Sequence, residues 1–591
     1  MSTWCATGRL AAVVRRAVCA LLVPVWLASA AAEARAEGKI LLQAPEAVAP
    51  LLEKYLTVLK SDHSQQLASF NDRIALTRRT RKEAANLLAT EGYFAPLIRL
   101  EKADAGDWNL AVETGPRATV GSVDLSLREG GALDGAEAAN QLEALRKRWT
   151  LGVGAPFTQS AWDAGKASLL ADLTRHEFAA ARISASLAKV NLEAATVDLQ
   201  VEVDPGPRFR FGEVEARGLD LYDTDLVRRY RPPEPGTPYD EDELLAFQTR
   251  LQNTPYFASA VVEIDREPEA AAATPVRVLV GEAKPKRLSL GAGFSSNNGY
   301  RAEIAYRNAN LFGRAWQLVS GLRIEQREML AYADVFLPPN PAGYQDSFGA
   351  LHERSDHEGL KVSREAFGVT RTYPWEKGEI SVSIRYQRER TTPDGSESST
   401  QKALTGDLAL LWREVDDVLE PRRGFVAYGR VGGAAKAALS TQNFVRSYGR
   451  LQVYLPVAER DVLTLRGELG KTVATSRDGI PQDFLFRAGG SQSVRGYGYR
   501  SLGVEDGGAV VGGRYLATMS AEYTHWRPDG LGYAAFIDAG NAVDEADDYR
   551  PLLGYGVGGR WKSPAGPLAL DLAYGQDERR FRLHFAILVA F

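Results

Sequence analysis

The chain has 591 residues, which is too long for a single hydrophobic core and predicts several domains. Its 71 basic and 75 acidic residues give a formal net charge of -4, so no overall basic field favours nucleic-acid binding. Hydrophobic residues make up 45% of the chain, yet no run after the N-terminus approaches the roughly 20 apolar residues of a membrane-spanning helix. This combination fits a transmembrane β-barrel, in which alternation dilutes the apolar residues.

Residues 1–36 have the pattern of a secretory signal peptide. Three arginines precede a mostly apolar stretch, and two alternative cleavage sites end at Ala30 and Ala36. An N-terminal membrane anchor is the alternative, although the apolar stretch is short for a membrane span. Both cysteines of the chain lie in this segment, so we expect the mature protein to have neither disulfides nor a catalytic thiol.

A weak unit then recurs three times, as a helical stretch, an aromatic signature and two strand-like runs. The signature phenylalanines are Phe94, Phe178 and Phe257, which are 84 and 79 residues apart. The predicted helices cover about 73–91, 159–175 and 240–253, and the predicted α+β domains are 38–115, 116–205 and 206–284. We expect the three phenylalanines to be core residues. An exposed strand edge of such a domain can accept an extended segment of another protein.

From residue 285 to residue 591, short alternating runs separated by turn residues replace helical periodicity. The even number of candidate strands and the aromatic residues at their ends predict a 16-stranded antiparallel transmembrane β-barrel. A soluble β-propeller or β-sandwich is the alternative. The candidate strands begin near residues 287, 299, 314, 328, 345, 361, 378, 402, 424, 443, 461, 511, 531, 553, 567 and 581.

The longest gap between candidate strands contains a glycine-rich segment, 489–500, which is predicted to be a folded loop. Its Arg495 lies among small and aromatic residues, where a guanidinium usually needs a planar acidic partner. Downstream, Asp538 is the one acid in an apolar strand-like run, which is costly unless the acid is paired. We therefore predict an Arg495–Asp538 pair. A solvated arginine on a surface loop is the alternative.

Enzymatic motifs are absent from the sequence. We find no phosphate-binding loop, no His-Glu-x-x-His helix and no Gly-x-Ser-x-Gly elbow, and the six histidines are scattered. We therefore expect no catalytic residue, no metal site and no cofactor, and a protein that is not an enzyme.

The loop and strand motifs resemble those of the BamA/TamA superfamily of outer-membrane barrel proteins. Their residues are Val494, Arg495, Gly496 and Tyr497 in the loop, and Phe536, Asp538 and Gly540 in the strand that receives the arginine. Segment 554–567 resembles the penultimate hairpin of the family. Segment 416–424 resembles another of its hairpins, and we interpret it as a charged turn rather than a site.

The resemblance implies three periplasmic POTRA-like domains and an outer-membrane barrel whose long loop folds back into the lumen. Three such domains favour the TamA type over BamA, with five, and over two-partner secretion exporters, with two. The implied function is the insertion of β-barrel or autotransporter clients through a lateral seam between the first strand, 287–294, and the last, 581–591. The seam residues are expected to be Leu288, Leu290, Gly291, Phe585, Ile587 and Phe591.

The implied partners are unfolded outer-membrane clients, outer-membrane lipid and a TamB-like periplasmic protein anchored in the inner membrane. Two alternatives remain open, a two-partner-type secretion pore and a passive porin. The last strand has apolar residues at every odd position from 581 to 591 and no glycine, although relatives often kink there. The extent to which the seam opens therefore stays undecided by the sequence.

Overall fold

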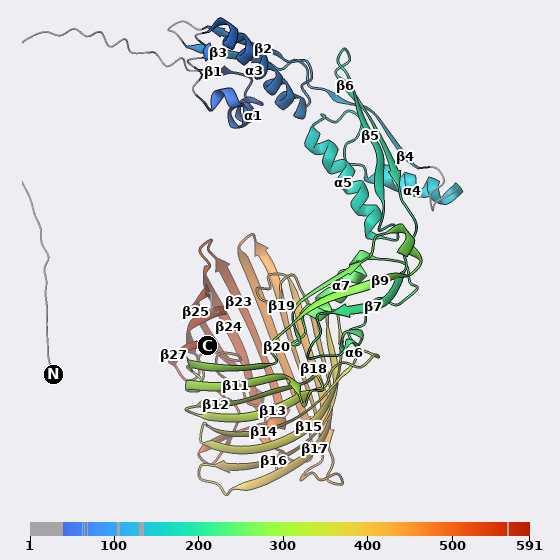
Figure 1. The fold of residues 1–591 in the computed structure, drawn as a ribbon. Coiled ribbons are helices and arrows are strands. Elements are labelled where there is room, and N and C mark those ends of the chain that lie inside the picture. Colours follow the sequence, from blue (N-terminus) through green and yellow to red (C-terminus); the bar gives the residue numbers. More distant parts are fainter. Residues whose placement is uncertain are drawn as a thin grey trace, which may run out of the picture. The chain divides into compact units, whose positions relative to one another are not determined.

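The computed structural model describes residues 40–61, 63, 66–67, 69–102, 107–128, 135–563 and 566–590, and of 566, 567 and 586–590 only the backbone. The expected signal peptide and Phe591 lie outside the described residues. The chain forms two compact units (Figure 1). One holds residues up to 128 with 136–169 and 183–203, and the other holds the rest, including 204–591. Within the described residues, no helix is both long and apolar enough to cross a membrane.

The first two N-terminal domains each contain a three-stranded mixed sheet. In the first, β1 is parallel to the central strand β3, and β2 is antiparallel to it. In the second, the order is β4-β6-β5, with β4 parallel to β6. The elements are β1 (Ile40–Gln43), α1 (Ala49–Tyr55), η1 (Thr57–Leu59), α3 (Phe70–Thr90), β2 (Leu97–Lys102), β3 (Trp108–Glu113), β4 (Thr119–Leu127), α4 (Gly135–Arg148), α5 (Gln159–Arg175), β5 (Arg182–Asn191) and β6 (Thr196–Asp204).

The third domain repeats this arrangement with the sheet order β7-β9-β8. Its helix α7 begins after Asp240, whose carboxylate accepts the backbone N–H groups of Asp242 and Glu243 and so caps the helix. Phe247 and Leu251 on the inner face of α7 are completely buried in the domain core. The elements are β7 (Phe211–Arg217), α6 (Thr224–Arg228), α7 (Glu241–Gln252), β8 (Phe257–Ile264), η2 (Pro268–Ala273) and β9 (Thr274–Glu282).

The signature phenylalanines differ in burial. Phe178 and Phe257 are core residues, in line with their interpretation from the sequence. Phe94 is only half-buried, and its ring packs against Phe157 at 5.7 Å between centroids. The prediction of a core position was therefore wrong for Phe94, because this ring lies outside the core cluster of its own domain and packs against a residue of the following domain.

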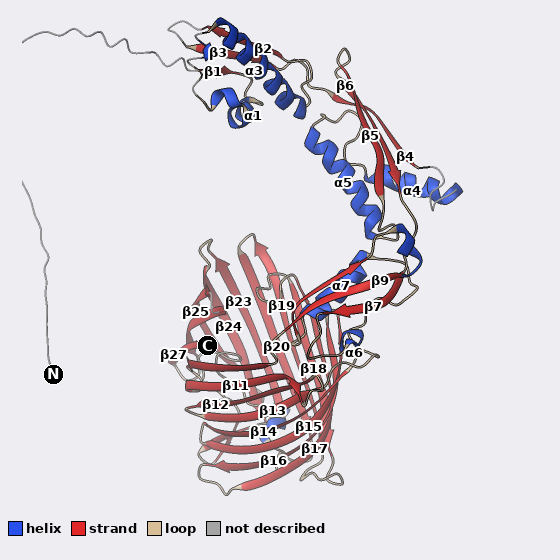
Figure 2. Cartoon of the chain, viewed as in Figure 1, coloured by secondary structure: helices blue, strands red, loops and turns tan. Residues whose placement is uncertain are grey.

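Sixteen strands close into an antiparallel barrel, in which each strand pairs with the next barrel strand along the chain and the last strand pairs with the first (Figure 2). The strands are β10 (Lys286–Ser295), β11 (Gly299–Leu311), β12 (Trp316–Glu325), β13 (Glu328–Phe336), β14 (Gln345–His357), β15 (Leu360–Trp375), β16 (Gly378–Pro393), β17 (Ser399–Val415), β18 (Gly424–Ala434), β19 (Phe444–Ala458), β20 (Asp461–Val473), β23 (Tyr515–Trp526), β24 (Leu531–Val543), β25 (Leu552–Ser563), β26 (Gly566–Gly575) and β27 (Arg580–Ala590).

The barrel wall follows the alternation that the sequence predicts. In β24, Tyr533 and Ile537 are exposed on the outer face, whereas Phe536 and Asp538 are buried on the lumenal face. The expected strand start at 511 is wrong by four residues, because β23 begins at Tyr515. The residues around 511 instead form β22 (Ala509–Val511), which pairs with β21 (Val504–Asp506) in a small hairpin inside the long loop.

Replacing Phe247 by alanine should destabilise the third N-terminal domain by about 3–5 kcal/mol, since it removes a fully buried ring and leaves a cavity. The measurement is limited proteolysis of the full chain in increasing urea, with the fragments of this domain followed. The control is Leu245→Ala in the same helix, where the side chain is 48% exposed and the cost should stay within about 0.5 kcal/mol. Equal urea sensitivity of the two variants would contradict this assignment of the core.

Candidate functional site in the barrel lumen

The loop between β20 and β23, residues 474–514, folds into the barrel. It contains η3 (Gln482–Phe484), β21 (Val504–Asp506) and β22 (Ala509–Val511). Val494 and Tyr497 of its central motif are completely buried in a cluster that also includes Leu516 and Ala542 of the barrel wall. The motif therefore packs against the lumenal face of β23 and β24, and the surface-loop alternative is wrong.

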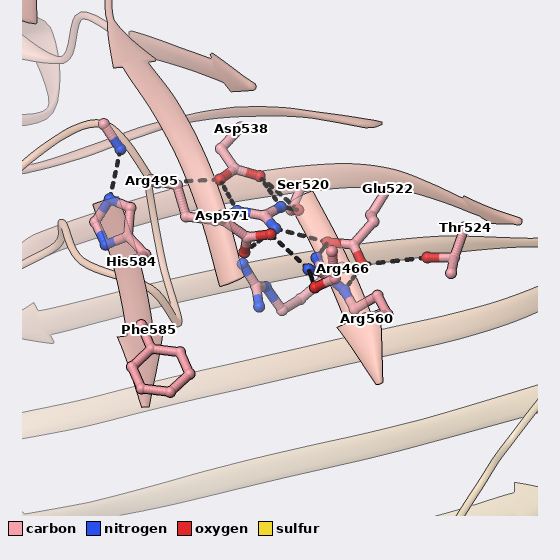
Figure 3. A network of polar contacts seen from close by, with 12 residues as sticks. Arg466, Arg495, Ser520, Glu522, Thr524, Asp538, Arg560, Asp571, His584 and Phe585 are labelled. Carbon is pink, nitrogen blue, oxygen red and sulfur yellow. Dashed lines mark hydrogen bonds and ion pairs between the residues drawn. The ribbon is translucent and has the colours of Figure 1, made fainter. Parts of the chain in front are cut away.

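Arg495 meets Asp538 at the centre of this contact (Figure 3). Its Nε donates to Oδ2 of the carboxylate at 2.7 Å, and Nη2 donates to Oδ1 at 2.9 Å. The backbone N–H of Arg495 donates to Oδ2 as well, at 3.0 Å. Both residues are buried, with Arg495 4% and Asp538 0% exposed. The geometry is the bidentate arginine–carboxylate pair, in which two parallel hydrogen bonds fix the orientation of the guanidinium.

Two further carboxylates surround the same guanidinium. Nη1 of Arg495 lies 2.6 Å from Glu522 on β23 and 3.2 Å from Asp571 on β26. Arg560 of β25 bridges these two acids, at 2.8 Å from Glu522 and 2.5 Å from Asp571. The three acids therefore share two guanidinium groups that are held between the strands (Figure 3).

Sequence reasoning named one acid and missed the others. Asp571 occupies a lumen-facing position in the alternating run of β26, and Glu522 does the same in β23. The sequence feature that could have indicated these two partners is the presence of acids at inward-facing positions of nearby strands. The strand register was needed to recognise that Arg560, two strands from Glu522, reaches the same point.

The guanidinium of Arg495 also contacts an aromatic ring and a serine hydroxyl. Its central carbon lies 3.4 Å from the ring centroid of Phe536, which places the cation over the aromatic face. Ser520 donates its hydroxyl to Asp538 at 2.6 Å, and Nη2 of Arg495 donates to the same hydroxyl at 3.3 Å. Gly540, the other predicted motif residue, lies two positions beyond Asp538 on β24 and has no side chain to contribute.

Two glycines permit the close approach of the loop to the wall. Gly496 has φ = 95°, a left-handed conformation that disfavours other residues, and a Cβ there would lie 2.7 Å from the backbone nitrogen of Gly575. A Cβ on Gly554 would lie only 1.8 Å from the carbonyl oxygen of Arg495. A side chain at either position would push the loop backbone away from the strands.

The loop also touches the strands on both sides of the barrel closure. The backbone N–H of Gly496 donates to Nε2 of His584 on β27 at 2.9 Å, so this ring nitrogen carries no proton in the contact. On the other side, the Asn297 amide beyond β10 donates to the Ser491 hydroxyl at 3.2 Å. Burial raises the pKa of Tyr497 to about 12, so its hydroxyl stays protonated and donates to Asp577 at 2.9 Å.

The closure itself is the shortest pairing in the described barrel. Five residue pairs join β10 to β27, from Gly291–Ala590 to Ser295–Ala586, whereas ten join β10 to β11 and sixteen join β15 to β16. Phe585 extends the contact, since its carbonyl oxygen accepts the N–H of Ser296 at 2.8 Å.

The remaining seam residues differ in position. Leu288 and Leu290 are exposed, and they precede the part of β10 that pairs with β27. Gly291 opposes Ala590, and Ile587 opposes Phe294. Phe591 lies outside the described residues. Within the described residues, no group of three or more histidines, cysteines, aspartates or glutamates is arranged to hold a metal ion.

Arg495→Ala should expose the loop to added protease while the barrel stays folded. Removal of one partner of a buried ion pair costs about 3–5 kcal/mol, and here it leaves Asp538 uncompensated. Proteolysis of the purified protein, with heat-modifiable gel migration as the test of barrel folding, measures both effects. Arg500→Ala is the control, since this side chain is half-exposed and lies over Tyr499 in the same loop. Equal protease resistance of all three proteins would contradict the anchor.

The reciprocal exchange, Arg495→Asp with Asp538→Arg, should not restore protection. The new carboxylate would face Glu522 and Asp571, and like charges at these distances repel. Restored protease resistance in the exchange variant would show that Asp538 alone holds the loop.

Residues 284–588 match the Omp85 superfamily domain. The outer membrane protein assembly factor BamA of Neisseria meningitidis serogroup B is 24% identical over 456 residues, covering 65% of this chain and 56% of that protein. BamA of Nitratidesulfovibrio vulgaris is 23% identical over 414 residues, covering 66% and 51%. The chain thus spans about half the length of the curated relatives it matches.

A solved structure shares this fold. The crystal structure of BamA from Haemophilus ducreyi lacking POTRA domains 1–3 has a TM-score of 0.66 and 16% identity, and the match covers 80% of this chain and 100% of that one. The family match covers more than half of the chain and includes the whole barrel apart from the last residues. This chain therefore belongs to the Omp85 superfamily, as a β-barrel protein of the bacterial outer membrane whose N-terminal POTRA-like domains lie in the periplasm.

Proposed function

We propose that this protein is an assembly factor that inserts β-barrel clients, autotransporters among them, into the outer membrane. Clients would enter through the seam between β10 and β27. The observation that carries the proposal is the seam itself, where, among the described residues, five pairs join β10 to β27 and every other strand interface of the barrel has between six and sixteen. A strand pair with few hydrogen bonds is the one that separates at least cost.

The chemistry of such an insertion needs no covalent step. When β10 and β27 part, each presents unpaired backbone N–H and C=O groups that can pair with an incoming strand. An unsatisfied backbone group in lipid costs several kcal/mol, so closing a client sheet supplies the free energy for its own insertion. Residues 286–290 of β10 have no described partner strand on the seam side, which supports β10 as the template edge.

The lumenal loop supports a gated barrel over a passive porin. It occupies the lumen, and it contacts the strand or turn on each side of the seam through His584 and Asn297. A change in loop position would therefore break contacts with residues on either side of the seam. The same loop is also compatible with a second function, that of a secretion pore through which a client passes once the loop has moved.

We further propose the TamA type, with a TamB-like inner-membrane-anchored partner. Three three-stranded sheets in the described N-terminal part support this type, as does the family resemblance of the motifs. Affinity capture from envelope extract with the full-length protein as bait tests the partner. Recovery of an inner-membrane-anchored periplasmic protein is the expected result, and capture of outer-membrane lipoproteins alone would favour the BamA type.

A disulfide across the seam should block client insertion and release it on reduction. Gly291→Cys combined with Ala590→Cys places two thiols at directly opposed positions, within the roughly 7 Å that a disulfide spans. The oxidising periplasm should close the bond, and no cysteine outside residues 1–36 competes for it. Assembly of an autotransporter client in cells, with and without reductant, is the measurement.

The matched control is Gly291→Cys with Ala586→Cys. Ala586 opposes Ser295, four residues away from Gly291, so this pair should neither cross-link nor affect assembly. If the locked seam delivers clients at the normal rate, lateral insertion is wrong and the secretion pore becomes the better account.

A further inference from the structure

The lumenal loop meets the barrel at a second ionic contact, on the wall opposite Arg495. η3 places Asp483 between two arginines of neighbouring strands. Oδ1 of Asp483 lies 2.5 Å from Nη1 of Arg364 on β15, and Oδ2 lies 3.5 Å from Nη1 of Arg385 on β16. In the ring of sixteen strands, β15 is seven strands away from β24, which carries Asp538. The loop therefore bridges the lumen between two ion-paired clusters.

Neighbouring contacts hold η3 in the orientation that this pairing needs. The backbone N–H of Gln482 donates to the carboxylate of Glu389 on β16 at 2.6 Å. The ring of Phe484 packs against Phe444 of β19 with centroids 4.9 Å apart. The hydroxyl of Thr472 donates to the carbonyl oxygen of Phe484 at 2.6 Å. These contacts fix the backbone of the turn that carries Asp483. Little further backbone entropy is therefore lost when the ion pair forms.

The two arginines depend on Asp483 to different degrees. Arg364 also pairs with Glu353 of the neighbouring strand β14. Arg385 has one ion pair among the described residues, the one with Asp483, and its Nη2 has no hydrogen-bond partner there. Withdrawal of the loop would break this ion pair and would also remove the Phe484 ring from the Arg385 guanidinium.

A hairpin of the same loop covers the rim of the same wall. Ala509 and Val511 of β22 form a buried cluster with Leu360 and Val362 of β15. The backbone N–H of Gly508 donates to the carbonyl oxygen of Asp394 at 2.7 Å. The contact of Asp483 therefore belongs to an extended attachment on this side, as Arg495 does on the other.

We propose that Asp483 is a second anchor of the loop, a positioning residue that works with Arg495 to keep the lumen closed. Each anchor contributes independently to one closed state, and the loop leaves the lumen when both ion-paired contacts have broken. The inference rests on the proposed function, in which loop movement accompanies opening, and it names the residues that set the threshold for that movement.

Single-channel recording of the purified full-length protein in a planar bilayer tests this without any client. Asp483→Asn keeps the shape of the side chain and removes its charge, and it should raise the fraction of time spent in large openings by about threefold or more. Arg495→Ala should raise it further, because that site is more deeply buried. The double variant should reach about the product of the two single effects, as expected for independent sites.

Three further variants distinguish this anchoring role from a non-specific destabilisation of the barrel. Asp483→Glu keeps the charge and should stay within about twofold of the wild type. Asp478→Asn changes a carboxylate in the same loop that contacts Ser476, and it should behave as wild type. Arg364→Gln breaks the shorter of the two pairs from the wall side and should raise the open fraction in the same direction as Asp483→Asn.

Heat-modifiable gel migration must match the wild type in each variant, so that an open channel reports loop release and not an unfolded barrel. The inference is overturned if Asp483→Asn conducts as the wild type does and adds nothing to Arg495→Ala. It is also overturned if Asp483→Glu opens the channel as much as Asp483→Asn. Because no client is present, these outcomes are independent of the seam disulfide experiment, which tests the proposed function.

Discussion

A buried guanidinium governs the organisation of this barrel. Burying the charge of Arg495 would cost several kcal/mol if it stood alone, and three acids on the strand wall remove that cost. The arrangement works in one geometry only, with the loop backbone pressed onto β25 and β26. The glycines at 496 and 554 are needed for that approach, because any Cβ there would collide with main-chain atoms. The local loop conformation, the three acids on the lumenal wall and the placement of these two glycines are thus all tied to this ionic contact.

A barrel of sixteen strands is too wide for its own inward side chains to fill. The loop between β20 and β23 supplies the missing material, and it combines buried apolar clusters with ion pairs to the strand wall. Ion pairs of this kind are directional, so the loop has one seated position. They also exchange readily for water once they are exposed, so the same loop can leave.

The seam between β10 and β27 has few paired residues, and it lies beside the lumenal loop. Five residue pairs close the cylinder there, and the loop contacts His584 of the last strand from inside. In the proposed mechanism, this contact would link movement of the loop to separation of the strands. The N-terminal sheets each have two edge strands, which gives the periplasmic part surfaces for extended segments that are independent of the barrel.

The class of fold and the number of barrel strands were predictable from the sequence alone. Alternation is a local property of the chain, and turn residues mark its ends, so fifteen of the sixteen strand starts were placed within three residues. The exception, near 511, is instructive. Its alternating residues pair with β21 inside the loop, because a short β-run can join either the wall or a hairpin, and sequence alternation is the same in both. The pairing of Arg495 with Asp538 was also accessible, since a lone acid in an apolar strand needs a partner.

The rest of the site could be recognised only once the strands were paired in three dimensions. Glu522, Arg560 and Asp571 lie on three different strands, and their meeting point depends on the register between those strands. Register is set by backbone pairing summed over the whole sheet, and no single strand carries it in its composition. The same reason explains why Asp483 was not recognised, since its arginines lie about a hundred residues earlier on the opposite wall. A sequence therefore shows which charges need partners, while closure of the barrel determines which partners they find.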